Sequence, residues 1–377
     1  MRGPGGTTMK RDAKRQAGRL ASRRGFLGAA AGAGIAASGG ARAQPGPREL
    51  RMVTAWPKNS AGLGMNAQRL ADAIGVMSGG RLKITVFAAG ELVPALQVFD
   101  AVADGRADLS HSTPHFAAGR NPSFRFFGNV PFGLTAHEHA AWLRFGGGQE
   151  LWDEACRQHG VVPMLVGTTG PQAGGWFRKE IRSLDDLKGL RMRAGGLGGE
   201  VLKRIGVNAV LTPPGEIAAA LQSGGLDAAE WNGPWNDREA GLHKMAKYYY
   251  MPGVLEIGPM LDLAVSRRVW DELSPDLQEI VRRAAAASAL DTYAEFTFQN
   301  AMNYPLLVQE GVEVRQFPKD VVAAMAKASE DLIAEIAATS PFARTVYDSF
   351  LKYRKAASAY AEVSDLAQLQ TRAGVGI

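Results

Sequence analysis

Cysteine is almost absent from the 377-residue sequence. Cys156 is the only one, so no disulfide can form within the chain. Its neighbours are typical of a helix, which predicts a buried thiol rather than a reactive one. Beyond the N-terminal region no stretch of about 18 apolar residues occurs, so no membrane-spanning helix is expected in the rest of the chain.

Signatures of common enzyme classes are missing as well. The six histidines have no zinc-binding spacing, and neither a Gly-x-Ser-x-Gly elbow nor a phosphate loop ending in Gly-Lys-Ser/Thr occurs. The glycine-rich run at residues 195–199 lacks the Gly-x-Gly-x-x-Gly spacing of dinucleotide-binding folds, because Val201 stands in place of the third glycine. A nicotinamide-dependent enzyme is therefore the weaker interpretation.

An excess of positive charge is absent once the N-terminus is set aside. The whole chain carries 43 Lys and Arg against 37 Asp and Glu, a net of +6. Residues 1–43 hold nine of the basic residues and one of the acidic ones, so the remainder has 34 against 36, a net of −2. A nearly neutral body has no bulk attraction for a polyanion, and no nucleic-acid partner is expected.

The N-terminal segment predicts export. Residues 22–27 read S-R-R-G-F-L, a twin-arginine signal, and an apolar run then leads to the cleavage pattern A-R-A at residues 41–43. That run is too short and too rich in Ala and Gly for a permanent transmembrane helix. We expect a mature protein that begins at Gln44 and resides in the periplasm. Because the twin-arginine route carries folded proteins, a cofactor or an ion could be acquired before export.

The order of the expected elements is that of an α/β protein with two lobes. Strands and helices alternate up to residue 112, which predicts a parallel sheet whose third strand, residues 107–112, lies at an edge. A second such set lies between residues 171 and 258. Longer helices are expected over residues 135–159, 274–310, 321–338 and 342–369.

The chain is organised around residues 185–200, D-D-L-K-G-L-R-M-R-A-G-G-L-G-G-E. Apolar and basic side chains alternate up to Arg193, as in a half-buried strand, and the glycines that follow are expected to end it before a helix begins at Glu200. Arg193 then lies at the C-terminal end of a strand, where α/β sheets bind ligands. Its planar guanidinium fits a carboxylate through two parallel hydrogen bonds. The alternative is a surface arginine beside a flexible turn.

Two other polar side chains, Gln172 and Glu230, also follow expected strands. Amide, carboxylate and main-chain carbonyl oxygens are hard ligands, which suit sodium or calcium rather than zinc or copper. A small carboxylate could supply the remaining oxygens while Arg193 neutralises it. From these residues alone, a solvated Glu230 and core positions for Trp231 and Trp235 are the simpler interpretation.

The sequence resembles a known family at this point. The segments that carry the resemblance are G-G-W-F-R-K-E-I (174–181), D-L-K-G-L-R-M-R (186–193), G-L-G-G-E-V-L (196–202) and A-A-E-W-N-G-P (228–234). They resemble solute receptors of TRAP transporters, periplasmic binding proteins of the DctP type. P-F-G-L at 131–134 and Y-Y-Y-M-P-G at 248–253 also fit, so the resemblance covers about residues 50–310. It is strongest to receptors for 2-oxo acids and related small carboxylates.

The resemblance implies a fold of class α/β. It is the two-lobe periplasmic binding protein fold, with hinge strands, a long lobe-spanning helix and a C-terminal helical extension. The implied parts are a signal peptide (1–43), one lobe (44–170 and 259–298), a second lobe (171–258 and 299–345) and a C-terminal helix (346–377). Dimers through a long C-terminal helix occur in that branch, so residues 342–369 would form a homodimer contact.

The resemblance also implies the site and its partners. Arg193 would take the carboxylate of a small ligand, beside a sodium or calcium ion. The implied metal ligands are Gln172, Glu230, the carbonyl of Trp231, and Glu256. The implied substrate-binding residues are Arg193, Gln172, Phe116, Asn232 and Trp231. The protein would have no catalytic residues and would deliver its ligand to the membrane permease of a TRAP transporter.

Two departures from that branch bear on the ligand. The chain has His115-Phe116 where the branch often has a tyrosine pair, so a hydroxyl donor is missing and the identity of the acid is left open. Residues 254–258 read V-L-E-I-G in place of W-H-E-P-G, which predicts a more apolar wall and a larger or branched acid.

Two rival functions remain open from the sequence. One is an exported oxidoreductase with a bound cofactor, the other a signalling receptor of the same fold that docks a sensor instead of a permease.

Overall fold

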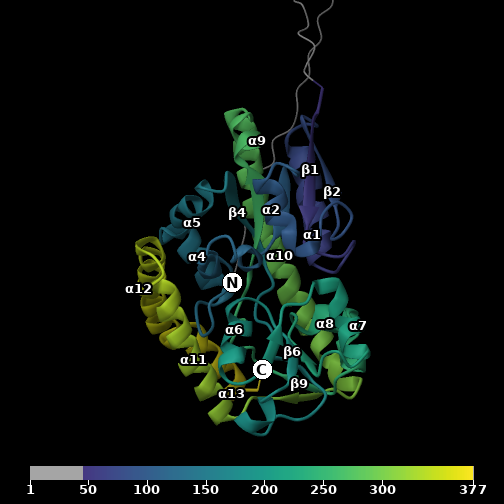
Figure 1. Cartoon of the computed structure of the whole chain (residues 1–377), viewed down its shortest axis with the longest axis vertical. Coiled ribbons are helices and arrows are strands. Elements are labelled where there is room, and N and C mark those ends of the chain that lie inside the picture. The colour runs from purple at the N-terminus through teal and green to yellow at the C-terminus, as the bar shows by residue number, and fades with distance from the viewer. Residues whose placement is uncertain (1–45, 377) are drawn as a thin grey trace, which may run out of the picture. The chain divides into compact units, whose positions relative to one another are not determined.

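The strands of the protein form two sheets (Figure 1). The computed structural model describes residues 46–376, so the twin-arginine motif and the cleavage pattern lie outside the described residues. One sheet has five strands in the order β2-β1-β3-β10-β4, and the other has six in the order β11-β9-β5-β8-β6-β7. Within the described residues no helix is both long enough and apolar enough to cross a membrane.

The first sheet is mixed rather than parallel. β1 (Arg48–Thr54) pairs in parallel with β2 (Leu82–Phe87) and β3 (Leu109–Ser112), whereas β10 (Met260–Ser266) lies antiparallel between β3 and β4 (Val161–Thr168). The expected edge position of the third strand is therefore wrong, because β10 covers that side. All seven residues of β10 are buried, so it lacks the alternation by which a half-exposed strand is recognised in a sequence.

The second sheet is built from short strands. β6 runs parallel to β7 and β8, β9 runs parallel to β11, and β5 is antiparallel to β8 and β9. The strands are β5 (Gly175–Phe177), β6 (Arg191–Arg193), β7 (Asn208–Val210), β8 (Ala228–Ala229), β9 (Tyr248–Tyr250) and β11 (Glu313–Arg315).

Two main-chain crossings connect the sheets, residues 169–174 between β4 and β5 and residues 251–259 between β9 and β10. They run side by side, since the amide of Gly253 donates to the carbonyl of Gln172 at 2.8 Å. The third connection is α10 (Pro275–Gln309), which packs against β4 of the first sheet and against α8 near the second (Figure 1). Pro305 lies inside α10 and does not end it.

The remaining helices cover the two sheets. They are α1 (Leu63–Met77), α2 (Val98–Ala103), α3 (Phe124–Gly128), α4 (Ala136–Phe145), α5 (Gly148–Arg157), α6 (Gly196–Arg204), α7 (Ile217–Gln222), α8 (Pro234–Glu239), α9 (Arg267–Asp271), α11 (Lys319–Ala337), α12 (Pro341–Val363) and α13 (Asp365–Gly374). Short 3-10 helices are η1 (Ala95–Gln97), η2 (Pro114–Ala117), η3 (Leu184–Leu187), η4 (Pro214–Glu216) and η5 (Leu242–Lys244).

Three expected helix boundaries are wrong. The single helix expected over residues 135–159 is α4 and α5, separated where Gly147 has a positive φ of 83°. The helix expected over residues 342–369 is divided at Ser364. α6 begins at Gly196 instead of Glu200, so glycines lie within its first turns. A Cβ on Gly199 would be 2.9 Å from the carbonyl oxygen of Ala194, and glycine permits this close approach.

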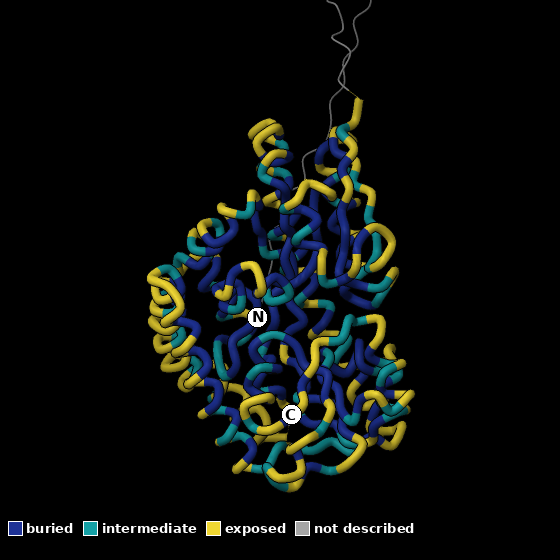
Figure 2. The backbone as a smooth tube through the Cα atoms, viewed as in Figure 1, coloured by how far each residue is buried: buried dark blue, intermediate teal, exposed yellow. Residues whose placement is uncertain are grey.

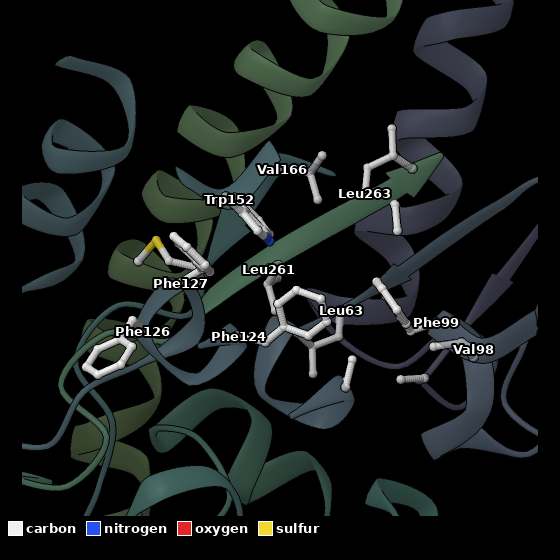
Figure 3. Packing of buried hydrophobic residues seen from close by; sticks show 14 of the residues in the cluster. Leu63, Val98, Phe99, Phe124, Phe126, Phe127, Trp152, Val166, Leu261 and Leu263 are labelled. Carbon is white, nitrogen blue, oxygen red and sulfur yellow. The ribbon is translucent and has the colours of Figure 1, made fainter. Parts of the chain in front are cut away.

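Aromatic side chains from α3 pack in the core beside β10. Figure 3 shows Phe127 of α3 beside Trp152, and the two rings stack at 5.6 Å between centroids, whereas the ring of Phe126 lies 6.4 Å from that of Phe350 of α12. Phe124, Phe126 and Phe127 are all buried, and burial of each such ring contributes roughly 2 kcal/mol. Cys156 is buried in α5, which confirms the expectation of a buried thiol. Figure 2 shows buried strands and, by contrast, a largely exposed outer face on α12.

Candidate functional site

A cavity of about 30 Å³ lies between the two sheets. Most of the residues that line it follow the ends of strands or belong to the two crossings. The volume corresponds to about two waters, so the walls close around a small space. All the site residues expected from the sequence line this one cavity: Phe116, Gln172, Arg193, Glu230, Trp231, Asn232 and Glu256. Their roles in binding stay predictions.

Arg193 ends β6 and is 3% exposed, which excludes the surface alternative. Its Nη1 donates to Oε2 of Glu230 at 2.6 Å and to the main-chain oxygen of Glu230 at 2.7 Å. The ring of Trp231 lies 5.2 Å from Cζ and covers the guanidinium. Within residues 46–376 neither Nε nor Nη2 donates to an acceptor, and Nε is buried. These two nitrogens form one edge of the planar fork, which can take a carboxylate side-on.

Two buried carboxyl groups lie beside this single guanidinium. Burial raises the pKa of Glu230 to about 7, although the charge of Arg193 opposes the rise. Burial, and then the neighbouring charge of Glu230, raises the pKa of Glu256 well above its usual value. Additional positive charge bound in the cavity would favour the ionised form of both.

A chain of side-chain amides fixes the orientation of Gln172. It starts at the main-chain oxygen of Ala61, which can only accept a hydrogen bond. Nδ2 of Asn236 donates to this oxygen at 2.9 Å. Oδ1 of Asn236 then accepts from Nδ2 of Asn232 at 2.9 Å, and Oδ1 of Asn232 accepts from Nε2 of Gln172 at 2.7 Å. The side-chain oxygen of Gln172 must therefore point the other way, toward Glu230.

That orientation brings three oxygens together. The side-chain oxygen of Gln172 lies 3.0 Å from Oε1 of Glu230 and 3.1 Å from the main-chain oxygen of Trp231, and it faces only acceptors. Acceptors at this distance repel unless a cation lies among them or the carboxyl group of Glu230 carries a proton. An amide, a carboxylate and a carbonyl are the ligands of sodium or calcium, so the residues fit the ion that the sequence predicts.

The donor set differs from that of a transition-metal site. Among residues 46–376 no group of three or more His, Cys, Asp or Glu is placed to hold a metal ion. In a site for sodium or calcium, the oxygens of Gln172 and Trp231 would take the place of further charged ligands. Asn232 uses both ends of its amide on protein partners, so its geometry is that of a support for Gln172.

Sequence analysis missed Thr113 and Trp56, which also line the cavity. Thr113 follows β3, and its hydroxyl lies 2.9 Å from Nδ1 of His115. Trp56 follows β1 and donates from Nε1 to Nδ1 of the buried His111 at 2.8 Å. Their position just after strands is the signal that could have found them.

The segment 254–258 contributes less to the cavity than expected. Only Glu256 of these five residues lines it, while Val254 and Leu255 border a separate space of about 10 Å³. The apolar wall expected to favour a larger or branched acid is therefore not part of this cavity.

An α/β protein that encloses a small cavity between two sheets, with a buried arginine edge inside it, has the architecture of a solute receptor. Residues 52–340 match the family model described as bacterial extracellular solute-binding protein, family 7, DctP. The chain belongs to this family, which confirms the resemblance inferred from sequence. The comparisons lend no support to the exported oxidoreductase.

Three similar proteins illustrate the family. A monocarboxylate 2-oxoacid-binding periplasmic protein of Nostoc sp. is 40% identical over 84% of this chain and 86% of its own length. A TRAP transporter solute-binding protein of Bordetella bronchiseptica has a TM-score of 0.85 at 35% identity, covering 88% of this chain and 99% of that one. It is a dimer with copurified calcium and picolinate in one site. A TRAP periplasmic solute-binding protein of Pseudoalteromonas atlantica, with bound sodium and pyruvate, has a TM-score of 0.83 at 37% identity. The match covers 86% of this chain and 99% of that one.

Proposed function

We propose that the chain is the receptor of a TRAP-type secondary transporter and captures a small 2-oxo or 2-hydroxy monocarboxylate together with a cation. The Nε–Nη2 edge of Arg193 carries the proposal. It is a guanidinium edge in a closed cavity, it has no acceptor among residues 46–376, and it lies beside an ion pair that holds the group rigidly. A carboxylate is the ligand that such an edge fits.

The metal site would be formed by Gln172, Glu230 and the carbonyl of Trp231, with Glu256 as a further oxygen. A sodium or calcium ion bound there would offset the buried negative charge and accept oxygens of the ligand. Pyruvate and picolinate, the ligands of the two similar structures, share a carboxylate with a second donor atom on the neighbouring carbon. We infer that this chain selects acids of that kind.

Binding and release, without catalysis, would be the whole task of the protein. The family is extracellular and the N-terminal segment has an export signal, which supports a location in the periplasm. The partner that receives the acid would be the membrane permease of the transporter. When the sheets enclose the ligand, water is excluded and the ion pair of Arg193 with the carboxylate strengthens.

Isothermal titration calorimetry with pyruvate and calcium tests the proposal. It compares the affinities of variants at two arginines of the same strand. Arg193→Ala is expected to weaken binding by roughly 100-fold or more, because a buried carboxylate loses its partner. Arg191→Ala is the matched control, since Arg191 is exposed and pairs with Asp227 at the surface. Equal affinity in Arg193→Ala and Arg191→Ala would contradict the proposal.

A homodimer through the C-terminal helices is a second part of the proposal. Exposed apolar side chains recur every three residues across α12 and α13, at Tyr360, Val363, Leu366 and Leu369. Two of these side chains lie on each of two successive exposed helices, and exposed apolar side chains gathered in this way are typical of a surface that a partner covers. The dimeric structure from Bordetella bronchiseptica supports a second copy of this chain as the occupant.

A further inference from the structure

His115 belongs to η2, which follows β3 of the first sheet, and it lines the cavity near Arg193. Its ring is held between two glycines. A Cβ on Gly128 would be 3.2 Å from Nδ1, and a Cβ on Gly196 would be 3.4 Å from Cδ2. Phe116 packs edge-on against the ring, with 4.8 Å between centroids. The position of the imidazole is therefore defined by packing before any ligand binds.

The two ring nitrogens of His115 have different surroundings. Nδ1 is 2.9 Å from the hydroxyl of Thr113. Nε2 has no hydrogen-bond partner in the part of the chain that the structure describes, and it lies 3.7 Å from the position of a Cβ on Gly195. Nη2 of Arg193 lies 3.8 Å from that same position. The two nitrogens are therefore at most 7.5 Å apart, a separation that one carboxylate can bridge with a hydrogen bond from each.

The charge state of His115 supports a donor role. The surrounding protein, Arg193 and Arg125 lower its pKa to about 3, so the ring is neutral near pH 7. A neutral imidazole has one N–H, and the partner of the other nitrogen decides which one carries it. If the Thr113 hydroxyl donates to Nδ1, the hydrogen is on Nε2, which is the nitrogen that the ligand can reach.

We propose that His115 donates a hydrogen bond from Nε2 to the ligand carboxylate, and that Thr113 is the positioning residue that holds this tautomer. The inference rests on the proposed function and deepens it. Arg193 and Gln172 reach the ligand from the second sheet and the crossing, whereas His115 reaches it from the first sheet. A carboxylate shared by Arg193 and His115 would tie the two sheets together, so that recognition of the acid and closure of the cavity occur as one event. The missing tyrosine hydroxyl is replaced by an imidazole N–H.

Titration calorimetry with pyruvate in saturating calcium tests the pair. His115→Phe removes the N–H and is expected to weaken binding roughly 10-fold. Thr113→Val removes the hydroxyl at constant shape and is expected to weaken binding roughly 5-fold. Thr113→Ser restores the hydroxyl and is expected to bind within about twofold of the wild type. In the His115→Phe background, Thr113→Val should cause no further loss, because it acts through the imidazole.

The tautomer can be observed directly by ¹⁵N NMR of the histidine rings in wild-type protein, with His115→Phe used for assignment. We expect the Nε2–H form in the pyruvate complex and a partial shift to Nδ1–H in Thr113→Val. Either an Nδ1–H form in the wild-type complex or equal losses in Thr113→Val and Thr113→Ser would overturn the inference. If the wild type bound pyruvate and His115→Phe bound it equally well, only this inference would fail. If the wild type bound no carboxylate, the proposed function would fail first.

Discussion

Glu230 joins two parts of the site in one residue. Its Oε2 and its main-chain oxygen fix Nη1 of Arg193, while its Oε1 is one of the three oxygens that converge near Gln172. The carboxylate therefore orients the guanidinium for the ligand and supplies charge to the proposed cation. Because Glu230 engages only Nη1, the Nε–Nη2 edge of the buried arginine has no acceptor among residues 46–376.

Glu230→Gln separates these two uses. The amide oxygen can still accept from Arg193, but the charge that favours a cation is gone. We expect the affinity of Glu230→Gln for pyruvate to be the same with calcium as with a chelator. Titration calorimetry with pyruvate under each of the two conditions measures this. Glu330→Gln, at an exposed position on α11, is the control and should keep the calcium dependence of the wild type. Persistent calcium dependence in Glu230→Gln would remove Glu230 from the metal site.

Asp262 is a further buried carboxyl group, and its side chain does not line the cavity. It lies on β10 opposite Ser112, and Oδ1 of Asp262 and Oγ of Ser112 are both buried without a hydrogen-bond partner among the described residues. Burial raises the pKa of Asp262 to about 7. An acid whose folded pKa exceeds its unfolded value stabilises the fold at low pH, and that contribution is lost as pH rises toward 7.

Asp262→Asn should therefore change the pH dependence of stability. Between pH 5 and pH 8 we expect wild type to lose on the order of 2 kcal/mol relative to the variant, because only wild type must give up the buried proton. Urea unfolding of both proteins at the two pH values measures the difference. A gap that stays constant with pH would show that Asp262 has an ordinary pKa in the folded protein.

At the scale of elements, the crossing between β9 and β10 is held close to the start of α4. A Cβ on Gly258 would lie 2.7 Å from the backbone nitrogen of Ala136. The backbone of a helix cannot easily move aside to relieve such a contact. The same crossing carries Glu256 into the cavity. The position of this carboxyl group therefore depends on a glycine contact made by a residue that does not itself line the cavity.

Gly258→Ala is expected to destabilise the protein by about 2–3 kcal/mol, as overpacking does. Gly119→Ala is the matched control, since a Cβ there would have no atom within 4 Å. It should stay within about 0.5 kcal/mol of wild type. Urea unfolding of the two variants compares them, and equal stabilities would mean that the crossing can move away from α4.

The limits of sequence reasoning also follow from particular elements. Arg193 was predictable because alternation marks β6 and places it at the strand end. β10 was not, because a strand buried on every face has no alternation, and Ser364 divides two helices without a glycine or proline signal. The pairing of Thr113 with His115 depends on the short 3-10 helix η2, and Glu256 lies within an irregular crossing, so spacing could not place either beside Arg193. Glu256 was expected there only through the family resemblance.

At the scale of the whole molecule, the apolar stripe across α12 and α13 predicts the oligomeric state. Light scattering should give the mass of a dimer for wild type, and that of a monomer for Leu366→Glu with Leu369→Glu, because buried charge opposes the contact. Gln368→Glu with Gln370→Glu adds the same charge to exposed polar positions of α13 and should leave the dimer intact. A monomeric wild type would remove the second copy from the proposal.

The central claim is that one cavity holds a carboxylate on Arg193 beside a cation among three oxygens. A crystal structure grown with pyruvate and calcium, with anomalous diffraction data, tests it most directly. The account predicts an anomalous peak among the oxygens of Gln172, Glu230 and Trp231, and the pyruvate carboxylate on Nε and Nη2 of Arg193. A pyruvate bound elsewhere, or an Arg193 that contacts only Glu230 in the complex, would contradict it.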